Sequence, residues 1–354
     1  MGKKILKSSF ICALNALIFV LLVGTTRTQI PLYIAGMSIQ GAKTEQQDRY
    51  YITQNTAHEG LVAGIFDGHG SDGDKFAQMA KEKFVTLFEQ YKEQFEGNVN
   101  QAKIKRLITE IFKKVNAALW KQYGHTQGGG TTALIAFRKD DTLFIAHCGD
   151  SRAVWGKNRS MQTKDHTGSN VKEIRRVGRK NIISVRGVPR LGGTLMVTRS
   201  LADFDLKQKG LSGTPEIVTV NLKKHPLVIL GCDGLWDGTS SKMNKRSEQN
   251  DNNSFLYDLV LKTVPEDRIV GWTEHDVVFA IKKIITAAIC STLDPQGRCK
   301  ALQNLENMAC QATKQEVTTV INKFDWTKAA FFDHFIQENQ QYVHDNTTAI
   351  IIYA

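Results

Sequence analysis

Four aspartates in this sequence share one setting, at the end of a short apolar run. Asp67 follows LVAGIF, Asp150 follows TLFIAHCG and Asp233 follows PLVILGC, whereas Asp345 precedes NTTAIIIY. If these runs are strands that end together, the carboxylates meet, and their mutual repulsion raises their pKa values and destabilises the fold. A divalent metal ion relieves that repulsion. Oxygen ligands without cysteine suit the hard ions Mg²⁺ or Mn²⁺.

The alternative for each aspartate is an ordinary turn residue, because Asp and Gly are common in turns. Taken alone, the stretch GIFDGHGSDG at residues 64–73 supports a turn about as well as a site. Four such placements in one chain are hard to explain by turns alone, so we favour the metal site. Asp72, in the same stretch, has no expected role in metal binding and keeps the turn interpretation.

The elements that must position these residues can be distinguished by the period of their apolar side chains. Five runs are short and rich in β-branched residues, which is typical of buried strands: LVAGIF, TTALIAF, TLFIAH, PLVILG and TAIIIY. Apolar residues recur at three- and four-residue steps over 76–91 and over 104–119, which predicts two amphipathic helices. Because the helices are consecutive, we expect a helical pair on a sheet, not alternating strand–helix units.

The composition is that of a globular protein with a basic excess. The 354 residues are 42% hydrophobic and 23% charged, with a net charge of +11 and a pI near 9.3. Nucleic acid, an anionic membrane or a phosphorylated partner would suit that charge, and so would a solvated basic surface. We expect no nucleic-acid partner, because the basic residues are not interleaved with aromatic ones as in single-strand binders.

The N-terminus predicts a secretory leader. Basic MGKKILK is followed by the fifteen-residue apolar run FICALNALIFVLLVG and then by polar TTRTQ, which is the order of a signal peptide. The run is short for a bilayer span of about 20 residues, yet a signal-anchor stays open. We therefore expect residues 1–28 to direct the chain to the secretory pathway, secreted or anchored by this segment alone. A buried N-terminal helix is the alternative.

The six cysteines do not predict a structural zinc site, because no Cys-x-x-Cys occurs. Cys148 and Cys232 each end an apolar run, and we expect them to be small buried core residues. A bridge between Cys290 and Cys299 is conceivable in a secreted protein.

Motifs in a fixed order carry a resemblance to a known family. They are MSIQGAKTEQQDRYY, GIFDGHGSDG, GGGTTALIAF, AHCGDSRAVW, RLGGTLMVTRSLADFDLK, GTPEIVTV, LGCDGLWDG and HDNTTAIIIY. In this order they resemble the metal-dependent protein serine/threonine phosphatases of type 2C, over roughly residues 32–240 and again over 343–354. The resemblance implies an α+β fold across residues 32–354, in which a sandwich of two antiparallel sheets is flanked by helices on both faces.

The resemblance also implies metal-binding roles for individual residues. Asp67 is similar to the carboxylate that bridges two metal ions, and the Gly68 carbonyl to a ligand of one of them. Asp233 and Asp345 resemble ligands of the other ion. Asp150 resembles the residue that, with Asp233, holds a weaker third ion.

Two further residues resemble catalytic groups of the family. Asp48 is similar to a carboxylate that orients metal-bound water, and His69 to the general acid that protonates the leaving alcohol. An imidazole titrates in the right range for that step, although a structural histidine is the alternative. The implied reaction is hydrolysis of phosphoserine or phosphothreonine in a phosphoprotein by direct attack of a water bridging two Mg²⁺ or Mn²⁺ ions. We expect a monomer.

Two substitutions depart from the family pattern. Gln47 stands where the family often has Glu, so it offers a metal an uncharged carbonyl oxygen. Lys43 stands where we expect the phosphate-binding Arg, and it binds phosphate as a point charge without the bidentate fork. These departures leave open a catalytically weakened pseudophosphatase that acts as a binding or scaffold module.

The chain between the last two aspartates is also unusual, because Asp345 follows Asp233 by 112 positions. The excess, within about 241–342, is mostly helical in pattern and is either a docking element or a solvated decoration. The run RRVGRK at residues 175–180 is either a localisation patch or, by resemblance, a helix and turn beside the sheet. The segment between LADFDLK and GTPE is short, so we expect a small flap beside the site.

Overall fold

The computed structural model describes residues 32–41, 43–55, 60–124, 128–156, 161–238, 256–261, 273–292 and 345–354. The predicted leader at residues 1–28 lies outside this part of the chain, as do Cys299 and most of the predicted insertion. Within the described ranges, no helix is both long enough and apolar enough to cross a bilayer.

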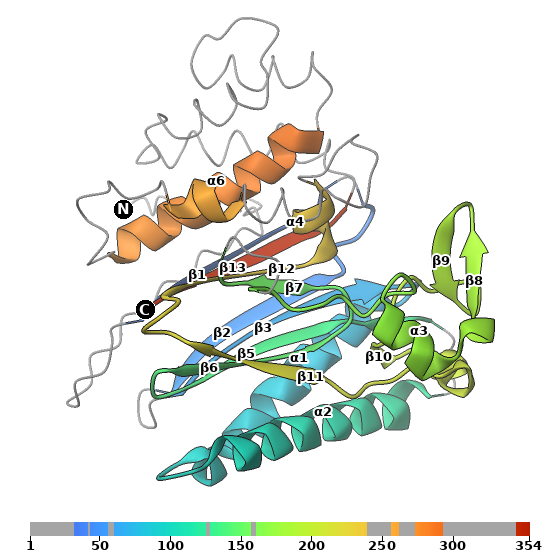
Figure 1. The fold of residues 1–354 in the computed structure, drawn as a ribbon, viewed down its shortest axis with the longest axis horizontal. Coiled ribbons are helices and arrows are strands. Elements are labelled where there is room, and N and C mark those ends of the chain that lie inside the picture. Colours follow the sequence, from blue (N-terminus) through green and yellow to red (C-terminus); the bar gives the residue numbers. More distant parts are fainter. Residues whose placement is uncertain are drawn as a thin grey trace, which may run out of the picture.

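Two antiparallel sheets pack face to face (Figure 1). The smaller sheet has the strand order β1-β13-β12-β7, and the larger has the order β10-β4-β3-β5-β6-β11, with β2 paired to β3. The strands of the smaller sheet are β1 (Tyr33–Ile39), β7 (Arg152–Val154), β12 (Leu227–Gly231) and β13 (Thr347–Tyr353). Those of the larger sheet are β2 (Asp48–Asn55), β3 (Gly60–His69), β4 (Gly130–Thr131), β5 (Ala133–Lys139), β6 (Thr142–Cys148), β10 (Leu201–Ala202) and β11 (Glu216–Asn221).

Helices cover both outer faces of this sandwich (Figure 1). On the larger sheet lie α1 (Gly73–Gln90) and α2 (Gln101–Tyr123), and α1 contacts β2, β3 and β4. On the smaller sheet lie α4 (Asp233–Gly238) and α6 (Glu274–Thr292), and α6 packs on β1 and β13. The predicted fold class is confirmed, and α6, which belongs to the predicted insertion, is helical as the pattern indicates.

Alternation along the strands divides their side chains between two cores. In β5, Leu134 and Ala136 face the smaller sheet, whereas Ile135 and Phe137 face α1 and α2. The predicted apolar stripes of α1 and α2 close the second of these cores. Asn100 caps α2, because its side chain accepts a hydrogen bond of 2.8 Å from the Lys103 N–H. Cys148 and Cys232 are free and buried, as expected.

Strand pairing brings the aspartates of the predicted metal site to one region. In the pairing of β2 with β3, Asp48 lies opposite Asp67. Asp233 begins α4, two residues after β12 ends, and Asp345 lies two residues before β13, which pairs with β12. The aspartates therefore come from both sheets of the sandwich and converge where those sheets meet.

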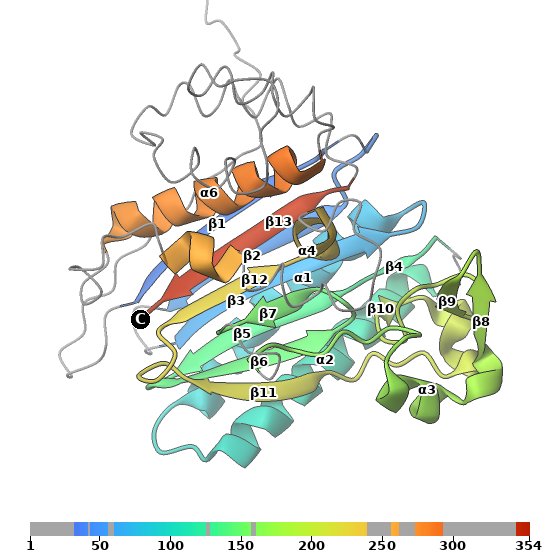
Figure 2. The same ribbon diagram turned by 45° about the horizontal axis from the view of Figure 1, so that its top comes forward.

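A smaller group of elements projects from one end of the sandwich, next to β10 (Figure 2). It contains α3 (Val171–Val177), the 3₁₀ turn η2 (Arg179–Asn181) and the hairpin of β8 (Ile182–Val185) with β9 (Val188–Leu191). RRVGRK is thus helix and turn, as the resemblance implies. The remaining 3₁₀ turns are η1 (Lys92–Phe95) and η3 (Phe204–Lys209). The stretch between η3 and β11, where we expect a small flap, is short. The projecting elements lie earlier in the chain, before η3.

Candidate metal centre

Three aspartates form the centre of the site. Asp67 in β3, Asp150 in the turn after β6 and Asp233 at the start of α4 each offer a carboxylate oxygen, and these oxygens lie within 4.8 Å of one another. Burial raises the pKa of each carboxyl, and repulsion between neighbouring aspartates raises it further. Two unit charges about 4 Å apart repel by roughly 4 kcal/mol at an effective dielectric constant near 20.

Asp48 adds a buried carboxylate beside Asp67. Its Oδ2 accepts a hydrogen bond of 2.7 Å from the Thr348 hydroxyl, whereas its Oδ1 is buried without a hydrogen-bond partner among the described residues. Burial raises the pKa of Asp48 to about 7, and the charges of Asp233 and Asp345 contribute. Asp48, Asp67 and the Cys232 thiol also lie within 4.8 Å of one another.

Lys43 and Asp345 face each other at the mouth of the site. The Lys43 Nζ lies 3.1 Å from Asp345 Oδ1, and both side chains are about half exposed. Burial opposes the charge of Lys43, but the hydrogen bond to Asp345 and the attraction of Asp233 and Asp67 outweigh it and raise the pKa of the amine. The predicted phosphate-binding cation is therefore held beside the predicted metal ligands.

Gly68 lies near the end of β3, just before the turn at Gly70 that leads into α1. A Cβ on Gly68 would lie 2.2 Å from the Gly73 carbonyl oxygen, so only glycine fits there. Gln47 supports this turn, because its side-chain amide donates a hydrogen bond of 2.9 Å to the Gly70 carbonyl. Since a glutamate has no N–H to donate, the amide at position 47 has a positioning role that a carboxylate would lose.

His69 ends β3 and pairs with Asp203. Its Nε2 lies 2.8 Å from Asp203 Oδ2, and that carboxylate also accepts a short hydrogen bond from the Ser200 hydroxyl. Burial disfavours the imidazolium, but the charge of Asp203 and its hydrogen bond outweigh burial and raise the pKa of His69. The close approach requires Gly130, since a Cβ there would lie 2.3 Å from Asp203 Oδ2. The His69 side chain is 26% exposed.

Two positioning residues were not predicted from the sequence. Asp203 lies inside the quoted LADFDLK motif, and its backbone has φ +44°, the left-handed region that Asp tolerates better than most residues. Asn346 lies between Asp345 and β13, where its side chain accepts from the Gln47 N–H at 2.8 Å and donates to the Gln40 carbonyl at 2.6 Å. Asn346 thereby ties the loop that carries Lys43 to the smaller sheet.

A second cluster supports the Asp150 turn. His166 Nδ1 accepts a hydrogen bond of 3.3 Å from the Gly149 N–H, and the His166 backbone N–H donates to the Gly149 carbonyl at 3.0 Å. The proton of neutral His166 is therefore on Nε2, which faces Glu216 Oε2 at 3.5 Å. His147 stacks on this ring at 4.3 Å and is neutral, because burial lowers its pKa to about 3. This tautomer leaves Nε2 no lone pair for a metal ion.

The donor set of the aspartate centre fits divalent cations. Its donors are carboxylate oxygens, which suit Mg²⁺ or Mn²⁺. The buried Asp48 Oδ1 has no partner among the described residues, and the pKa values of the aspartates are raised, so Lys43 and the other described groups compensate the negative charge of the centre only in part. Asp72 lies apart from it, paired with Lys75 at 2.6 Å, in keeping with the turn interpretation.

The sequence matches a family model and several relatives. Residues 33–243 match the family described as protein phosphatase 2C. The chain is 32% identical to protein phosphatase 1L of Bos taurus over 59% of its own length, and 28% identical to protein phosphatase 1A of Homo sapiens over 56%. These matches span only 61% and 56% of the two relatives. A probable protein phosphatase 2C of Caenorhabditis elegans is 25% identical, and the match covers 83% of this chain and 87% of that protein.

Solved structures share the fold. The serine-threonine phosphatase 2C of Toxoplasma gondii has a TM-score of 0.57 at 16% identity, covering 96% of this chain and 99% of that one. A sex determining protein of C. elegans also reaches 0.57, at 19% identity, covering 90% of this chain and 64% of that one. At these identities the likeness concerns the fold alone.

Proposed function

This chain belongs to the protein phosphatase 2C family, and from that premise we propose that it is a Mg²⁺- or Mn²⁺-dependent protein serine/threonine phosphatase. The observation that carries the proposal is the convergence of Asp67, Asp150 and Asp233 within 4.8 Å, next to the paired His69. The proposed reaction is hydrolysis of a phosphoserine or phosphothreonine monoester by direct attack of water on phosphorus.

The metal ligands in this proposal are oxygen donors from both sheets. Asp67, the Gly68 carbonyl, Asp233 and Asp345 would hold two ions, and Asp150 would contribute to a third. Bound ions would neutralise the charge of the phosphate and lower the pKa of a water between them. Asp48, whose Oδ1 has no hydrogen-bond partner among the described groups, would orient the attacking water.

His69 would supply the proton that the leaving oxygen needs. As water attacks phosphorus, the bond from phosphorus to the serine or threonine oxygen breaks, and that oxygen takes a proton from the imidazolium. Asp203 holds Nε2 of His69, which leaves Nδ1 to carry the transferred proton. The raised pKa of His69 favours the protonated ring before the reaction. Lys43 would leave Asp345 to contact a phosphate oxygen.

A second candidate, the pseudophosphatase, is favoured by a specific arrangement. Gln47 donates to Gly70 and adds no charge to the centre, and Lys43 is paired with Asp345. A protein with these groups fixed in place would keep the fold and bind partners without turnover. Calorimetric titration of Mn²⁺ separates the two, because tight binding of two ions supports the enzyme and no binding supports the scaffold.

The proposal is tested with the purified full chain on a phosphothreonine peptide, with Mn²⁺ and with a chelator. We expect turnover that the chelator abolishes and that Asp233→Asn reduces by at least about 100-fold, because one ligand of the ions is neutralised. The matched control is Asp72→Asn, an equal change at a carboxylate that pairs with Lys75 instead of lying in the centre. Turnover that resists the chelator, or an inactive wild type, would refute the metal-dependent mechanism.

A further inference from the structure

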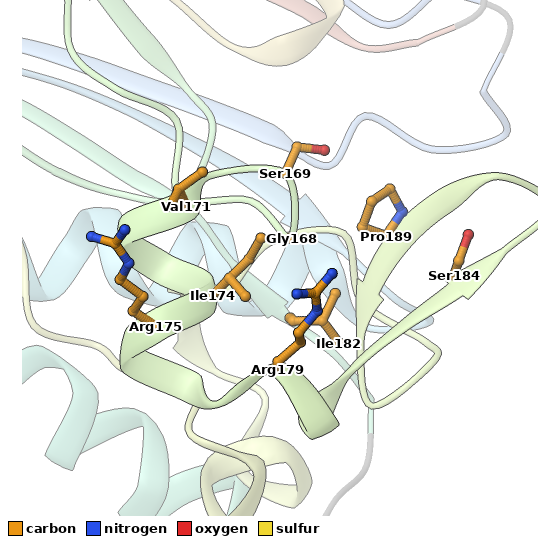
Figure 3. A pocket seen from close by; sticks show the side chains of 9 residues that line it. All are labelled: Gly168, Ser169, Val171, Ile174, Arg175, Arg179, Ile182, Ser184 and Pro189. Atoms are coloured by element: carbon orange, nitrogen blue, oxygen red, sulfur yellow. The ribbon is translucent and has the colours of Figure 1, made fainter.

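A surface pocket of about 860 Å³ lies between α3 and the β8–β9 hairpin (Figure 3). Ile174 of α3, Ile182 of β8 and Pro189 of β9 give it apolar walls, while Arg175 and Arg179 are charged groups in its lining. Figure 3 shows Arg179 rising between the helix and the hairpin, and Arg175 on the flank of α3. The pocket thus combines apolar walls with two guanidinium groups.

The two pocket arginines differ from their neighbours in having no protein partner. Arg175 and Arg179 are exposed, and neither makes an ion pair or side-chain hydrogen bond within the described ranges. Arg176, on the same helix, instead binds Glu173 Oε2 at 2.7 Å and the Thr198 carbonyl at 2.8 Å. Arg199 pairs with the same glutamate at 2.6 Å. The fold therefore uses Arg176 and Arg199 for its own stability and leaves Arg175 and Arg179 available.

Exposed apolar side chains concentrate on the projecting elements and on the segment just after them. Eight large hydrophobic residues of the described chain are exposed, and five of them lie between residues 171 and 196: Val171, Ile183, Val185, Val188 and Met196. Val171, which also lines the pocket, is 58% exposed. Apolar groups gathered in one exposed region next to unpaired charges are typical of a surface that binds a partner.

The pocket lies at the end of the sandwich where His69 ends β3. Gly168, in its wall, donates a backbone hydrogen bond of 3.2 Å to the Met196 carbonyl. A few residues after Met196, the Ser200 hydroxyl donates to the carboxylate of Asp203, which pairs with His69. Figures 1 and 2 both place α3, β8 and β9 next to β10, which pairs with β4 beside His69. A polypeptide whose phosphorylated residue enters the metal centre can therefore extend toward the pocket.

We propose that this pocket binds an acidic segment of the phosphoprotein substrate, with carboxylates on Arg175 and Arg179 and an apolar side chain against Ile174 and Ile182. Guanidinium groups bind carboxylates in a bidentate manner, and the net charge of +11 attracts acidic chains over longer distances. The inference rests on the proposed function for the identity of the partner. It adds a preference for acidic residues beside the phosphorylated one.

The test compares two phosphothreonine peptides, one with glutamates and a leucine beside the phosphothreonine and one with glutamines in place of the glutamates. For Arg175→Ala with Arg179→Ala, we expect KM for the acidic peptide to rise about tenfold, as two charged contacts are lost, with little change in kcat. Turnover of p-nitrophenyl phosphate, which is too small to reach the pocket, should stay the same. The control, Lys172→Ala with Lys180→Ala, removes equal charge from neighbouring exposed residues that do not line the pocket.

Each outcome decides the inference. An equal rise in KM for the control pair would mean unspecific attraction, and a wild type without preference for the acidic peptide would overturn the pocket's role. Binding to anionic vesicles that depends on the two arginines, without an effect on peptides, would assign the surface to a membrane instead. If wild type hydrolyses neither peptide, fluorescence anisotropy with the labelled acidic peptide still tests docking. Arginine-dependent binding would then support the pocket while the proposed activity fails.

Discussion

At the scale of single residues, the pairing of His69 with Asp203 gives a sharp prediction. In Asp203→Asn the amide oxygen can still accept a hydrogen bond, but the charge that raises the pKa of His69 is lost. Turnover of phosphothreonine peptides should fall by about 10- to 100-fold, and the alkaline limb of the kcat–pH profile should move to lower pH. Turnover of p-nitrophenyl phosphate should be nearly unchanged, because nitrophenolate leaves without a proton.

Asp205→Asn is the control for this change, since Asp205 is exposed two residues further along the same turn. Its pH profile should match that of wild type on both substrates. An equal loss on both substrates in Asp203→Asn would contradict the general-acid role and indicate that Asp203 only maintains the local fold.

The sequence predicted the candidate metal ligands but not the residues that position the site. The strand-end aspartates could be predicted because their position depends on local apolar runs. Asp203 could not, because its partner His69 lies 134 residues away and their meeting depends on how the strands assemble. Asn346 bonds a backbone N–H 299 residues away, so the same limit applies. The donor role of the Gln47 amide also depends on tertiary contact, here with Gly70.

At the scale of elements, predictions succeeded where periodicity was strong. The five apolar runs correspond to β3, β5, β6, β12 and β13, and the two helical stripes to α1 and α2. The β8–β9 hairpin was not predicted, because its strands have only four residues each. Since β8 is largely exposed and β9 is only partly buried, no buried alternation marks them. The signal available was its Arg186–Gly187 turn, where both residues have positive φ, as tight hairpins require.

The attachment of α3 to the sandwich gives a prediction about acid stability. Glu173 is buried, which alone would raise its pKa, but hydrogen bonds from Arg199, Arg176 and Thr198 outweigh burial and lower the pKa to about 2. Because the folded pKa lies below the ordinary value of 4.5, this carboxylate stabilises the fold above that pH. The contribution is lost as the pH falls from there toward 2.

Glu173→Gln should therefore lower the free energy of unfolding by roughly 3 kcal/mol at neutral pH, because two arginines lose a buried partner. The difference from wild type should shrink as the pH falls below the ordinary carboxyl range. Urea denaturation at neutral and acidic pH measures both quantities. Glu89→Gln, which breaks only the exposed pair with Lys92, should cost less than about 1 kcal/mol. A pH-independent difference for Glu173→Gln would contradict the electrostatic explanation.

At the scale of the whole molecule, the metal centre joins the two sheets. Asp48, Asp67 and Asp150 come from strands and turns of the larger sheet, whereas Asp233 and Asp345 flank strands of the smaller one. Repulsion among these carboxylates opposes the packing of the two sheets, whereas bound cations would attract carboxylates of both sheets and favour it. Metal binding is therefore expected to affect the global stability of the sandwich as well as the reaction.

The direction of this effect with pH follows from the raised pKa values of the aspartates. Without metal, burial and the neighbouring aspartates raise the pKa of Asp48 to about 7, well above its value in an unfolded chain. The metal-free fold is therefore most stable when this carboxyl is protonated, and the contribution is lost as the pH rises from the ordinary value of 3.8 to about 7. Cations bind the ionised carboxylates, so protons compete with them and metal affinity rises over the same interval.

Thermal unfolding of the full chain, with saturating Mn²⁺ or with a chelator, should show this competition between protons and metal ions directly. At about pH 8 we expect the metal to stabilise by roughly 2.7 kcal/mol when its concentration is about 100-fold above Kd, which is several degrees in Tm. At about pH 6 the gain should be much smaller, because the carboxyls hold protons that the cation must displace. In Asp67→Asn the gain should be small at both pH values. A stabilisation that is equal at both pH values in wild type would place the bound ion away from these aspartates.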